Sequence, residues 1–317
     1  MPKVSVIIPI YGTEKFIQRC ARSLFNQTLD DIEYIFINDC TPDRSLDLLQ
    51  DVISEFPDRK QQIIIENMSM NSGLPAVRKH GIKIATGEYI IHCDSDDWVD
   101  VTMYKEMYNE AKLKGYDIIS CDYYCSNGNQ HIYKKCAFTY NDNKLSDLLS
   151  HRTAVSVCNK LVKKELYHND IIYPTHNMGE DYALVIQLAI HATNWGHINK
   201  PFYYYYFNNN SISNDQNQEK VINKWVGLNK NILLISNCLK KHDLYVKYKV
   251  EIEEEMFKYR EYLTSFILLD KKYREIWLNL YPDLNFWSEK GLKYKLRYLI
   301  IYFGLYPLLH KLKSYIR

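Results

Sequence analysis

The sequence predicts an α/β fold, with a Rossmann-like, mostly parallel sheet flanked by helices and a helical region at its C-terminal end. Two observations support this prediction. Short β-branched runs alternate with segments of helical periodicity through the N-terminal half, as in a parallel sheet with helices on its faces. From about Glu219 onward the apolar pattern is helical to the end. We therefore expect two domains, residues 1–218 and 219–317.

The first strand is predicted over residues 4–8, a run rich in valine and isoleucine that ends at Pro9. Thr13 is expected to cap the helix that follows, because apolar residues then recur at helical spacing from Phe16 to Leu24. The chain thus opens with one strand–helix unit.

Similar units follow along the chain. Thr41 and Pro42 are expected to form the N-cap and first position of a second helix. A third helix is expected over about 75–85, closed by Gly87. In the second half the signals are less regular, with a helix beginning after Gly179. Further strands are predicted at 34–37, 63–65, 89–93, 117–121 and 203–207.

Composition excludes several classes of protein. The 317 residues carry 40 Lys+Arg against 38 Asp+Glu, a net charge of +2, so nothing favours nucleic acid as a partner. None of the eight cysteines forms a CxxC pair, which argues against zinc-ribbon and thioredoxin-like sites. The N-terminus shows no signal-peptide pattern, and no apolar run reaches the roughly 20 residues of a membrane span. We expect a cytoplasmic protein.

An acidic cluster, Asp94-Ser95-Asp96-Asp97, follows directly after the strand predicted at 89–93. Ligands of parallel sheets bind beyond the carboxyl ends of the strands, where these side chains would lie. Adjacent carboxylates repel one another, and a bound Mg²⁺ or Mn²⁺ shared with a pyrophosphate would relieve that repulsion. The alternative is an Asp-rich turn that starts the next helix.

The order of motifs over residues 3–100 resembles that of family 2 glycosyltransferases, whose fold is called GT-A. The resemblance is moderate to about residue 213 and weak beyond it. The segments that carry it are Val4–Tyr11, Gln27-Thr28, Glu33–Asp39 with Thr41–Asp43, Asn71–Leu74 with Arg78 and Gly81, and Ala85–Ile91 leading to Asp94–Asp97. Such an enzyme moves a sugar from a nucleotide-sugar donor, most often a UDP-sugar, onto an acceptor hydroxyl.

The resemblance implies a role for each matched residue. Pro9, Tyr11 and Asp39 would form the nucleoside pocket, joined by Glu14, with Asp39 accepting a hydrogen bond from the base. Asn71, Gly73 and Arg78 would line the nucleotide and its phosphates. Asp94 and Ser95 would lie against the ribose and sugar, and Asp96 would be the main ligand of a divalent metal, Mn²⁺ or Mg²⁺. Pro9 and Gly73 can also be explained by turn geometry, and Arg78 by a solvated helix face.

The match has departures. Asn38 replaces the first Asp of the usual Asp-Asp pair, and Cys40 replaces the usual glycine. Lys79-His80 stands where Arg-Asn is commoner. These changes leave the matched Asp39 in place.

The sequence Gly179-Glu180-Asp181 resembles the family's Glu-Asp motif at a helix start. Inverting sugar transfer needs a base that removes a proton from the acceptor hydroxyl. We expect Asp181 to be this base, with Glu180 orienting the acceptor or taking over the role. The alternative is a pair of acids that complement the helix dipole.

Two segments near the C-terminal side bear on partners. Tyr203–Ser213 resembles the family's Tyr-rich strand and the Ser loop that follows it. That loop, which includes Asn208–Ser213, could close over the donor, and a plain surface turn is the alternative. Residues 291–317 carry six Lys or Arg and no acid around the apolar run 298–309, which suits an in-plane helix on an anionic membrane. Packing on the protein itself or on a second subunit is the alternative.

Taken together, these features predict a metal-dependent inverting glycosyltransferase of surface-polysaccharide biosynthesis, with a glycan or lipid-linked acceptor. The membrane reading would place it on the inner face of the plasma membrane. Two other functions stay open, a nucleotidyltransferase and a nucleotide-sugar-binding scaffold. The segment 9–13 lacks the Gly-rich basic loop of the first, and Asp96 and Asp181, whose loss would favour the second, are present.

Overall fold

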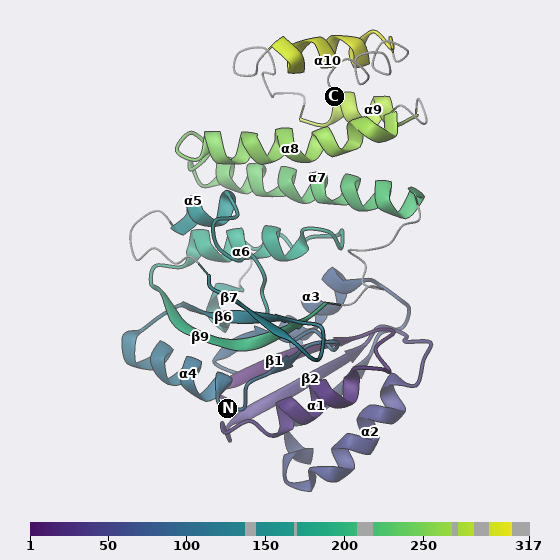
Figure 1. Ribbon diagram of the computed structural model, residues 1–317. Coiled ribbons are helices and arrows are strands. Elements are labelled where there is room, and N and C mark those ends of the chain that lie inside the picture. The colour runs from purple at the N-terminus through teal and green to yellow at the C-terminus, as the bar shows by residue number, and fades with distance from the viewer. Residues whose placement is uncertain (137–143, 168–169, 208–217, 268–271, 282–291, 306–317) are drawn as a thin grey trace. The chain divides into compact units, whose positions relative to one another are not determined.

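The computed structural model describes residues 1–136, 144–167, 170–207, 218–267, 272–281 and 292–305 (Figure 1). The predicted donor-closing loop at 208–213 and the basic residues beyond 305 therefore lie outside the described residues. The chain divides into two compact units, Met1–Asp215 and Gln216–Arg317.

The first unit is built on one mixed sheet with the strand order β3-β2-β1-β4-β8-β6-β9-β5, and β7 pairs with β6 at its side. The pairs among β1–β4, and β6 with β9, are parallel, whereas β8 runs antiparallel to both its neighbours. The strands are β1 (Val4–Ile10), β2 (Ile32–Asn38), β3 (Ile63–Asn67), β4 (Tyr89–His92), β5 (Trp98–Val99), β6 (Ile118–Ser126), β7 (His131–Lys134), β8 (Lys160–Lys163) and β9 (Trp195–Tyr206).

Helices cover both faces of this sheet, which confirms the predicted α/β class. In Figure 1, α1 and α2 lie below the sheet and α5 and α6 above it. The helices are α1 (Ile17–Phe25), α2 (Ser45–Glu55), α3 (Leu74–Ile84), α4 (Met103–Lys114), α5 (Lys144–Leu149) and α6 (Glu180–His191), with short 3₁₀ turns at Pro57–Gln62 and Lys164–Leu166.

The two predicted helix caps are wrong. Helix α1 begins at Ile17, and the Thr13 hydroxyl instead contacts the hydroxyls of Ser45 and Ser95. Helix α2 begins at Ser45, whose backbone N–H donates to the Asp43 carboxylate. Thr41 donates to the same carboxylate at 2.6 Å. Asp43 therefore holds the turn before the helix, because its short acidic side chain can accept from both groups at once.

The strand predicted at 4–8 extends through Pro9 to Ile10. β4 pairs only with the Val4–Ile7 part of β1, so Pro9 lies beyond the doubly paired stretch. Proline is tolerated there because its missing N–H breaks no ladder bond on that side. As a result the polar residues after β1, β2 and β4 meet at one edge of the sheet.

A buried carboxylate ties β1 and β2 to the turn before β4. Glu33 accepts from the Ser5 hydroxyl at 2.5 Å, from the Thr86 backbone and hydroxyl at 2.6 and 2.8 Å, and from the Gly87 N–H at 3.1 Å. Glycine is required at position 87 because an added Cβ would lie 2.7 Å from the Ser5 backbone nitrogen. Close approach, rather than helix termination, therefore explains Gly87.

The second unit is helical, as predicted. Its longest helices, α7 and α8, pack along each other, and their buried apolar residues include Ile232, Ile235, Leu239, Ile252 and Met256. The Arg260 guanidinium lies 4.0 Å from the centre of the Trp277 ring, a cation–π contact that joins α8 to α9. The helices are α7 (Gln218–Lys241), α8 (Lys249–Ile267), α9 (Lys272–Asn279) and α10 (Leu292–Tyr302).

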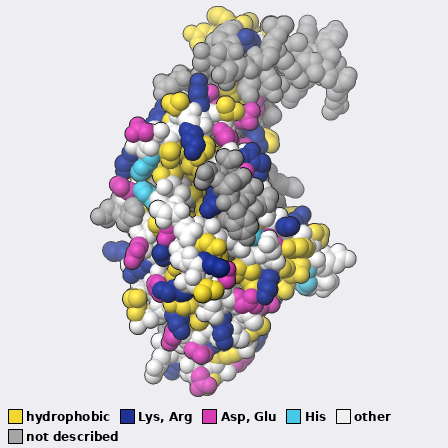
Figure 2. Space-filling view, turned by 90° about the vertical axis from the view of Figure 1, so that its left-hand side faces the viewer, with side chains coloured by type: hydrophobic (Ala, Val, Ile, Leu, Met, Phe, Trp, Pro, Cys, Tyr) yellow, Lys and Arg dark blue, Asp and Glu magenta, His cyan; other side chains and the backbone are white. Residues whose placement is uncertain are grey.

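Charges of both signs are interspersed over the face shown in Figure 2, as the near-neutral composition implies. None of the described helices combines the length and the apolar character needed to cross a membrane. All eight cysteines are free thiols.

Replacing Glu33 with alanine should lower the free energy of unfolding by about 2–3 kcal/mol, because several buried donors would lose their acceptor. Urea denaturation followed by circular dichroism measures the loss. Glu55→Ala is the matched control, since Glu55 pairs with Arg22 at the surface and its loss should lower the free energy of unfolding far less. Equal losses in the two variants would contradict the role given to Glu33.

Candidate active site

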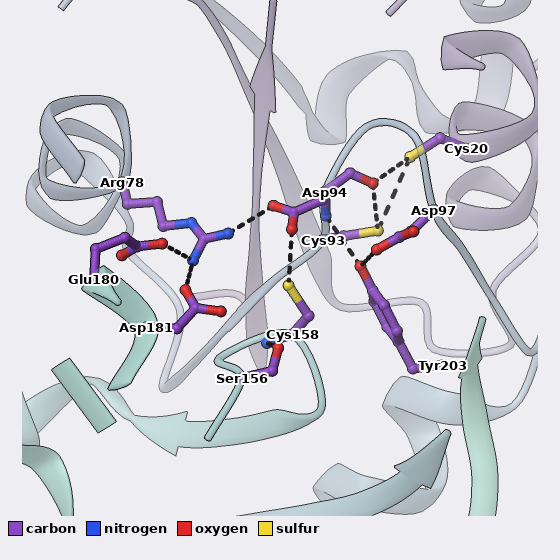
Figure 3. Close-up of polar contacts among 10 residues, drawn as sticks. All are labelled: Cys20, Arg78, Cys93, Asp94, Asp97, Ser156, Cys158, Glu180, Asp181 and Tyr203. Carbon is purple, nitrogen blue, oxygen red and sulfur yellow. Dashed lines mark hydrogen bonds and ion pairs between the residues drawn. The ribbon is translucent and has the colours of Figure 1, made fainter. Parts of the chain in front are cut away.

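The centre of the candidate site is a buried guanidinium, that of Arg78 on α3, whose side chain is only 2% exposed. Its Nη1 donates to Glu180 Oε1 at 2.5 Å and also to Asp181 Oδ1, while Nη2 donates to Asp94 Oδ1 at 2.7 Å (Figure 3). We call these four residues the arginine cluster. The alternative of a solvated helix face for Arg78 is therefore wrong, and its donors point at carboxylates of the protein itself.

The backbone explains how three elements meet at this point. Helix α3 lies close to β1 because Gly81 faces the sheet, where an added Cβ would come within 2.5 Å of Ile7 Cγ2. Gly179 has φ +76°, in the left-handed region, and turns the chain into α6 so that Glu180 and Asp181 open the helix. Asp94 follows the end of β4. Arg78 thus connects α3, α6 and the edge of the sheet.

The two acids of α6 differ in protonation. Burial raises the pKa of Glu180 well above its ordinary value, and the charge of Asp181 raises it further against the opposing effect of Arg78. Burial would also raise the pKa of Asp181, but Arg78 and the hydrogen bond with Glu180 outweigh it and lower the pKa. These opposite shifts favour a neutral Glu180 beside an ionised Asp181. Asp181 and Asp94, at 28% and 31% exposed, reach the surface, whereas Glu180 at 4% does not.

The four residues of the acidic turn, Asp94–Asp97, have different surroundings. Asp97 is buried and accepts from the Tyr203 hydroxyl at 2.5 Å and the Tyr206 N–H at 2.6 Å. Burial and the charges of Asp96 and Asp94 raise the pKa of Asp97. Ser95 is also buried, and its hydroxyl lies 3.2 Å from that of Thr13. Asp97 and Ser95 therefore fix the turn.

The donor set fits a metal held jointly with a substrate. Among the described residues, no group of three or more His, Cys, Asp or Glu could hold an ion by itself. Magnesium and manganese sites of nucleotide enzymes need only one or two carboxylates, because substrate phosphates and waters complete the shell. Asp96 is partly exposed, and its backbone carbonyl accepts from Arg19 at 2.7 Å. Asp96 and Asp94 are the carboxylates of the turn that could take part.

On the other side of the sheet edge, Asp39 organises the loop before α3. Its Oδ1 accepts from the Ser72 N–H at 2.7 Å and its Oδ2 from the Gly73 N–H at 2.9 Å. The Asn71 amide donates to the Asp39 carbonyl at 3.2 Å. The predicted residues Asp39, Asn71 and Gly73 are thus brought together, and Asp39 holds the loop in addition to any role with a base.

The other predicted nucleoside residues lie at the same edge. Pro9 is half-buried, Tyr11 is 54% exposed, and Glu14 is exposed with its carboxylate accepting from the Arg44 N–H at 3.3 Å. Cys40 has φ +56°, the left-handed region that favours the glycine it replaces. The departure at Cys40 therefore keeps the backbone conformation that a glycine would adopt.

A cavity of about 380 Å³ opens next to the arginine cluster. Asp94 and Asp181 line it together with the aromatic rings of Tyr123, Tyr203 and Tyr205. Its volume lies within the range of roughly 300–1,000 Å³ that small-molecule sites have.

Comparison with known proteins identifies the family to which the chain belongs. The model of glycosyl transferase family 2 matches residues 5–179, more than half of the chain. The chain belongs to glycosyl transferase family 2. The uncharacterized glycosyltransferase EpsJ of Bacillus subtilis is 39% identical over 133 residues, 42% of this chain and 37% of that protein. The poly(ribitol-phosphate) beta-glucosyltransferase of Bacillus spizizenii is 31% identical over 197 residues, 60% of this chain and 30% of that protein.

These two alignments span about a third of the curated relatives they match. Among solved structures, S. aureus TarS 1-349 in complex with UDP-GlcNAc superposes with a TM-score of 0.69 at 19% identity, covering 89% of this chain and 80% of that one. The likeness establishes that this family 2 protein has the GT-A fold with a C-terminal helical region.

Several residues of this family 2 site could not be predicted from the sequence. Cys158, whose Sγ lies 3.5 Å from Asp94 Oδ2, belongs to an irregular segment without a periodic signal. Tyr203 was predicted only as part of a strand, and its contact with Asp97 depends on β9 lying beside β5. Arg78 was predicted only near the phosphates, and its contacts with Glu180, Asp181 and Asp94 depend on how distant elements pack.

Replacing Arg78 with methionine should lower the free energy of unfolding at pH 8 by about 3–5 kcal/mol, since buried carboxylates would lose their cation. The loss should shrink toward pH 5. In the wild type, the lowered pKa of Asp181 gives stability that is present at neutral pH and is lost only as pH falls through that pKa. Without Arg78, acidification instead helps by protonating the carboxylates.

Chemical denaturation of both proteins at pH 5 and pH 8 measures this difference. Lys79→Met is the control, because it removes a neighbouring positive charge of α3. The described ring contact of Lys79 is with Tyr173. A loss for Arg78→Met that is the same at both pH values would contradict the electrostatic account.

Proposed function

We propose that this chain is an inverting glycosyltransferase that moves a sugar from a nucleotide-sugar donor to a hydroxyl of a cell-surface glycan or lipid-linked acceptor. The observation that carries the proposal is the Asp181 carboxylate, which Arg78 holds beside Asp94 in the lining of a cavity. An ionised carboxylate next to the acidic turn can serve as a base where the donor's anomeric carbon would lie. Family membership and the names of the relatives support the reaction class.

The donor is proposed to bind over the edge where β1, β2 and the loop before α3 end. Pro9, Tyr11, Glu14 and Asp39 would surround the nucleoside, and Asn71 and Gly73 would lie along the phosphates. Bound UDP-GlcNAc in the TarS structure makes UDP the first nucleotide to test. Arg78 is removed from the phosphate contacts, since its donors are directed at the carboxylates of the arginine cluster.

Asp96 is proposed as the main ligand of a divalent Mn²⁺ or Mg²⁺, with Asp94 and Ser95 near the ribose and sugar. Such a metal offsets the negative charge of the departing diphosphate. Asp97 is left out of the ligand set because its two carboxylate oxygens already accept from Tyr203 and Tyr206.

In the transfer step, the acceptor oxygen attacks the anomeric carbon from the side opposite the diphosphate. The new C–O bond forms as the bond to the diphosphate oxygen breaks, and the hydroxyl proton passes to Asp181. Glu180 stays protonated and orients the Asp181 carboxylate. Arg78 acts as a positioning residue, because it holds Asp181 and Asp94 on one rigid group.

The C-terminal unit is proposed to associate with a membrane or a partner chain. Leu296, Tyr302 and Phe303 are exposed apolar side chains in and next to α10, which also carries Lys295. An exposed apolar surface beside basic residues suits the inner face of the plasma membrane. The enzyme would then act in the cytoplasm on a lipid-linked acceptor.

Hydrolysis of a panel of nucleotide sugars should reveal one donor that turns over slowly with Mn²⁺ or Mg²⁺. EDTA and the Asp96→Ala substitution should both abolish that turnover, because the leaving diphosphate would keep its full charge. Asp51→Ala, an exposed acid on α2, is the control and should retain the wild-type rate. Absence of nucleotide binding by calorimetry across the whole panel would refute the enzyme reading.

Asp181→Asn should lower kcat by roughly 10²–10⁴-fold, the usual contribution of a general base, while donor binding stays close to that of the wild type. Glu180→Gln mimics the protonated acid in shape and donor capacity, so it should keep most of the activity. The released nucleoside diphosphate is the readout. A Glu180→Gln enzyme as inactive as Asp181→Asn would transfer the role of base to Glu180.

A further inference from the structure

The cavity beside the arginine cluster has a composition that restricts what can enter it. Its volume of about 380 Å³ lies within the range of small-molecule sites, so it can take a ligand of the size of a single sugar residue. Asp181 and Asp94 lie at one side of it, where the attacking oxygen would be under the proposed function. The ligand of this cavity is then the acceptor, and the inference below rests on that function.

The walls offer two kinds of surface. Tyr205, at 40% exposed, and Tyr123 present aromatic rings, which suit the apolar C–H face of a sugar. Thr153, Ser156 and Asn159 add hydroxyl and amide groups. Ionised carboxylates are strong acceptors for the hydroxyl groups of a neutral ligand.

None of the described residues that line the cavity is lysine or arginine. The nearest cations are engaged elsewhere. Lys160 donates to the carbonyls of Ala154 and Ser156 at 2.7 Å each and to Asn159 Oδ1 at 2.9 Å, which uses all three of its protons. Burial lowers the pKa of Lys160 to about 8, which weakens its charge further.

The other neighbouring cations are likewise paired with carboxylates or lie outside the cavity lining. Arg78 is shared among three carboxylates. Arg152, next to Thr153 in the chain, is paired with Asp147 at 2.7 Å. Lys134 lies opposite Tyr123 in the β6–β7 pair but is exposed and outside the cavity lining. The segments 137–143 and 208–217 contain no lysine or arginine in their sequence.

We infer that the cavity selects an uncharged sugar residue as the acceptor and rejects an anionic one such as a polyol phosphate. A neutral ring can place its C–H face on Tyr205 and its hydroxyls on Asp94 and Asp181. A phosphate group would bring negative charge toward two carboxylates and the donor diphosphate, with no lysine or arginine of the described lining to receive it. His151 is the one imidazole of that lining, and its ring packs against Tyr182. The specificity comes as much from this repulsion as from the aromatic contacts.

Binding to the full chain, with UDP and Mn²⁺ present at physiological salt, tests the inference. The probes are the methyl glycosides of glucose, galactose and N-acetylglucosamine, with ribitol 5-phosphate and glycerol 3-phosphate as anions. Saturation-transfer NMR and calorimetry should detect at least one glycoside and neither phosphate. Tyr205→Ala should weaken glycoside binding about tenfold, equal to about 1.4 kcal/mol. Tyr205→Phe, which keeps the ring, should weaken it far less.

A matched pair of variants tests the charge argument separately. Thr153→Lys adds a cation to the wall and should create measurable binding of ribitol 5-phosphate, whereas the neutral Thr153→Gln should not. Binding of either phosphate to the wild type as tight as that of the best glycoside would overturn the inference. So would the absence of binding by every glycoside, or glycoside binding that ignores Tyr205→Ala.

Donor hydrolysis without any acceptor, measured on the same samples, keeps the two proposals apart. Loss of UDP binding and of hydrolysis would overturn the proposed function itself. Normal donor hydrolysis together with phosphate binding would overturn only the acceptor class.

Discussion

The site depends on one buried ionic contact, that between Arg78 and the carboxylates of Asp94, Glu180 and Asp181. The guanidinium comes from α3, two of its partners open α6, and the third follows β4. A buried guanidinium is costly unless its donors are matched, and three buried or half-buried acids are costly without a cation. The acids therefore offset the cost of burying the guanidinium, and the guanidinium offsets the cost of burying the acids. The contact also fixes the two helices against the edge of the sheet.

The same contact sets the pKa values of the carboxyl groups within the site. Three carboxylates around one cation would leave excess negative charge, and burial raises the pKa of the most buried of them, Glu180, which favours its neutral form. The pKa of Asp181, which is more exposed and also bound to Arg78, is lowered instead. Two adjacent acids of one helix turn thus acquire different roles because their burial differs. A base and its neutral neighbour follow from the packing of α6 on α3.

The sequence predicted most of the strand–helix order in the first 100 residues, because apolar β-branched runs and helical periodicity are local signals. It missed β8, where Lys160–Lys163 has only two apolar residues and joins the sheet through antiparallel pairing with β4 and β6. The caps assigned to Thr13 and Thr41 failed because the two helices begin farther along the chain, at Ile17 and Ser45, and the Thr41 hydroxyl donates to Asp43 instead.

The candidate site was predictable as a set of residues but only partly as an arrangement. Asp94, Asp181 and Asp39 stand out because of their motifs, and the fold brings each to the same edge of the sheet. The partner of Arg78 could not be predicted, since Glu180 lies 102 positions away in the chain. Long-range contacts of this kind depend on how α6 packs, which no local pattern encodes.

The protonation of Glu180 is the most direct test of this account. Infrared spectroscopy at pH 7 of protein labelled with ¹³C in the glutamate carboxyl groups would report it without interference from the buried Asp97. The account predicts a carboxylic-acid band in the wild type that shifts with the label and is absent from Glu180→Gln. A wild-type spectrum with only ionised glutamate would contradict it, because Asp181 and Glu180 would then share Arg78 as two equivalent anions.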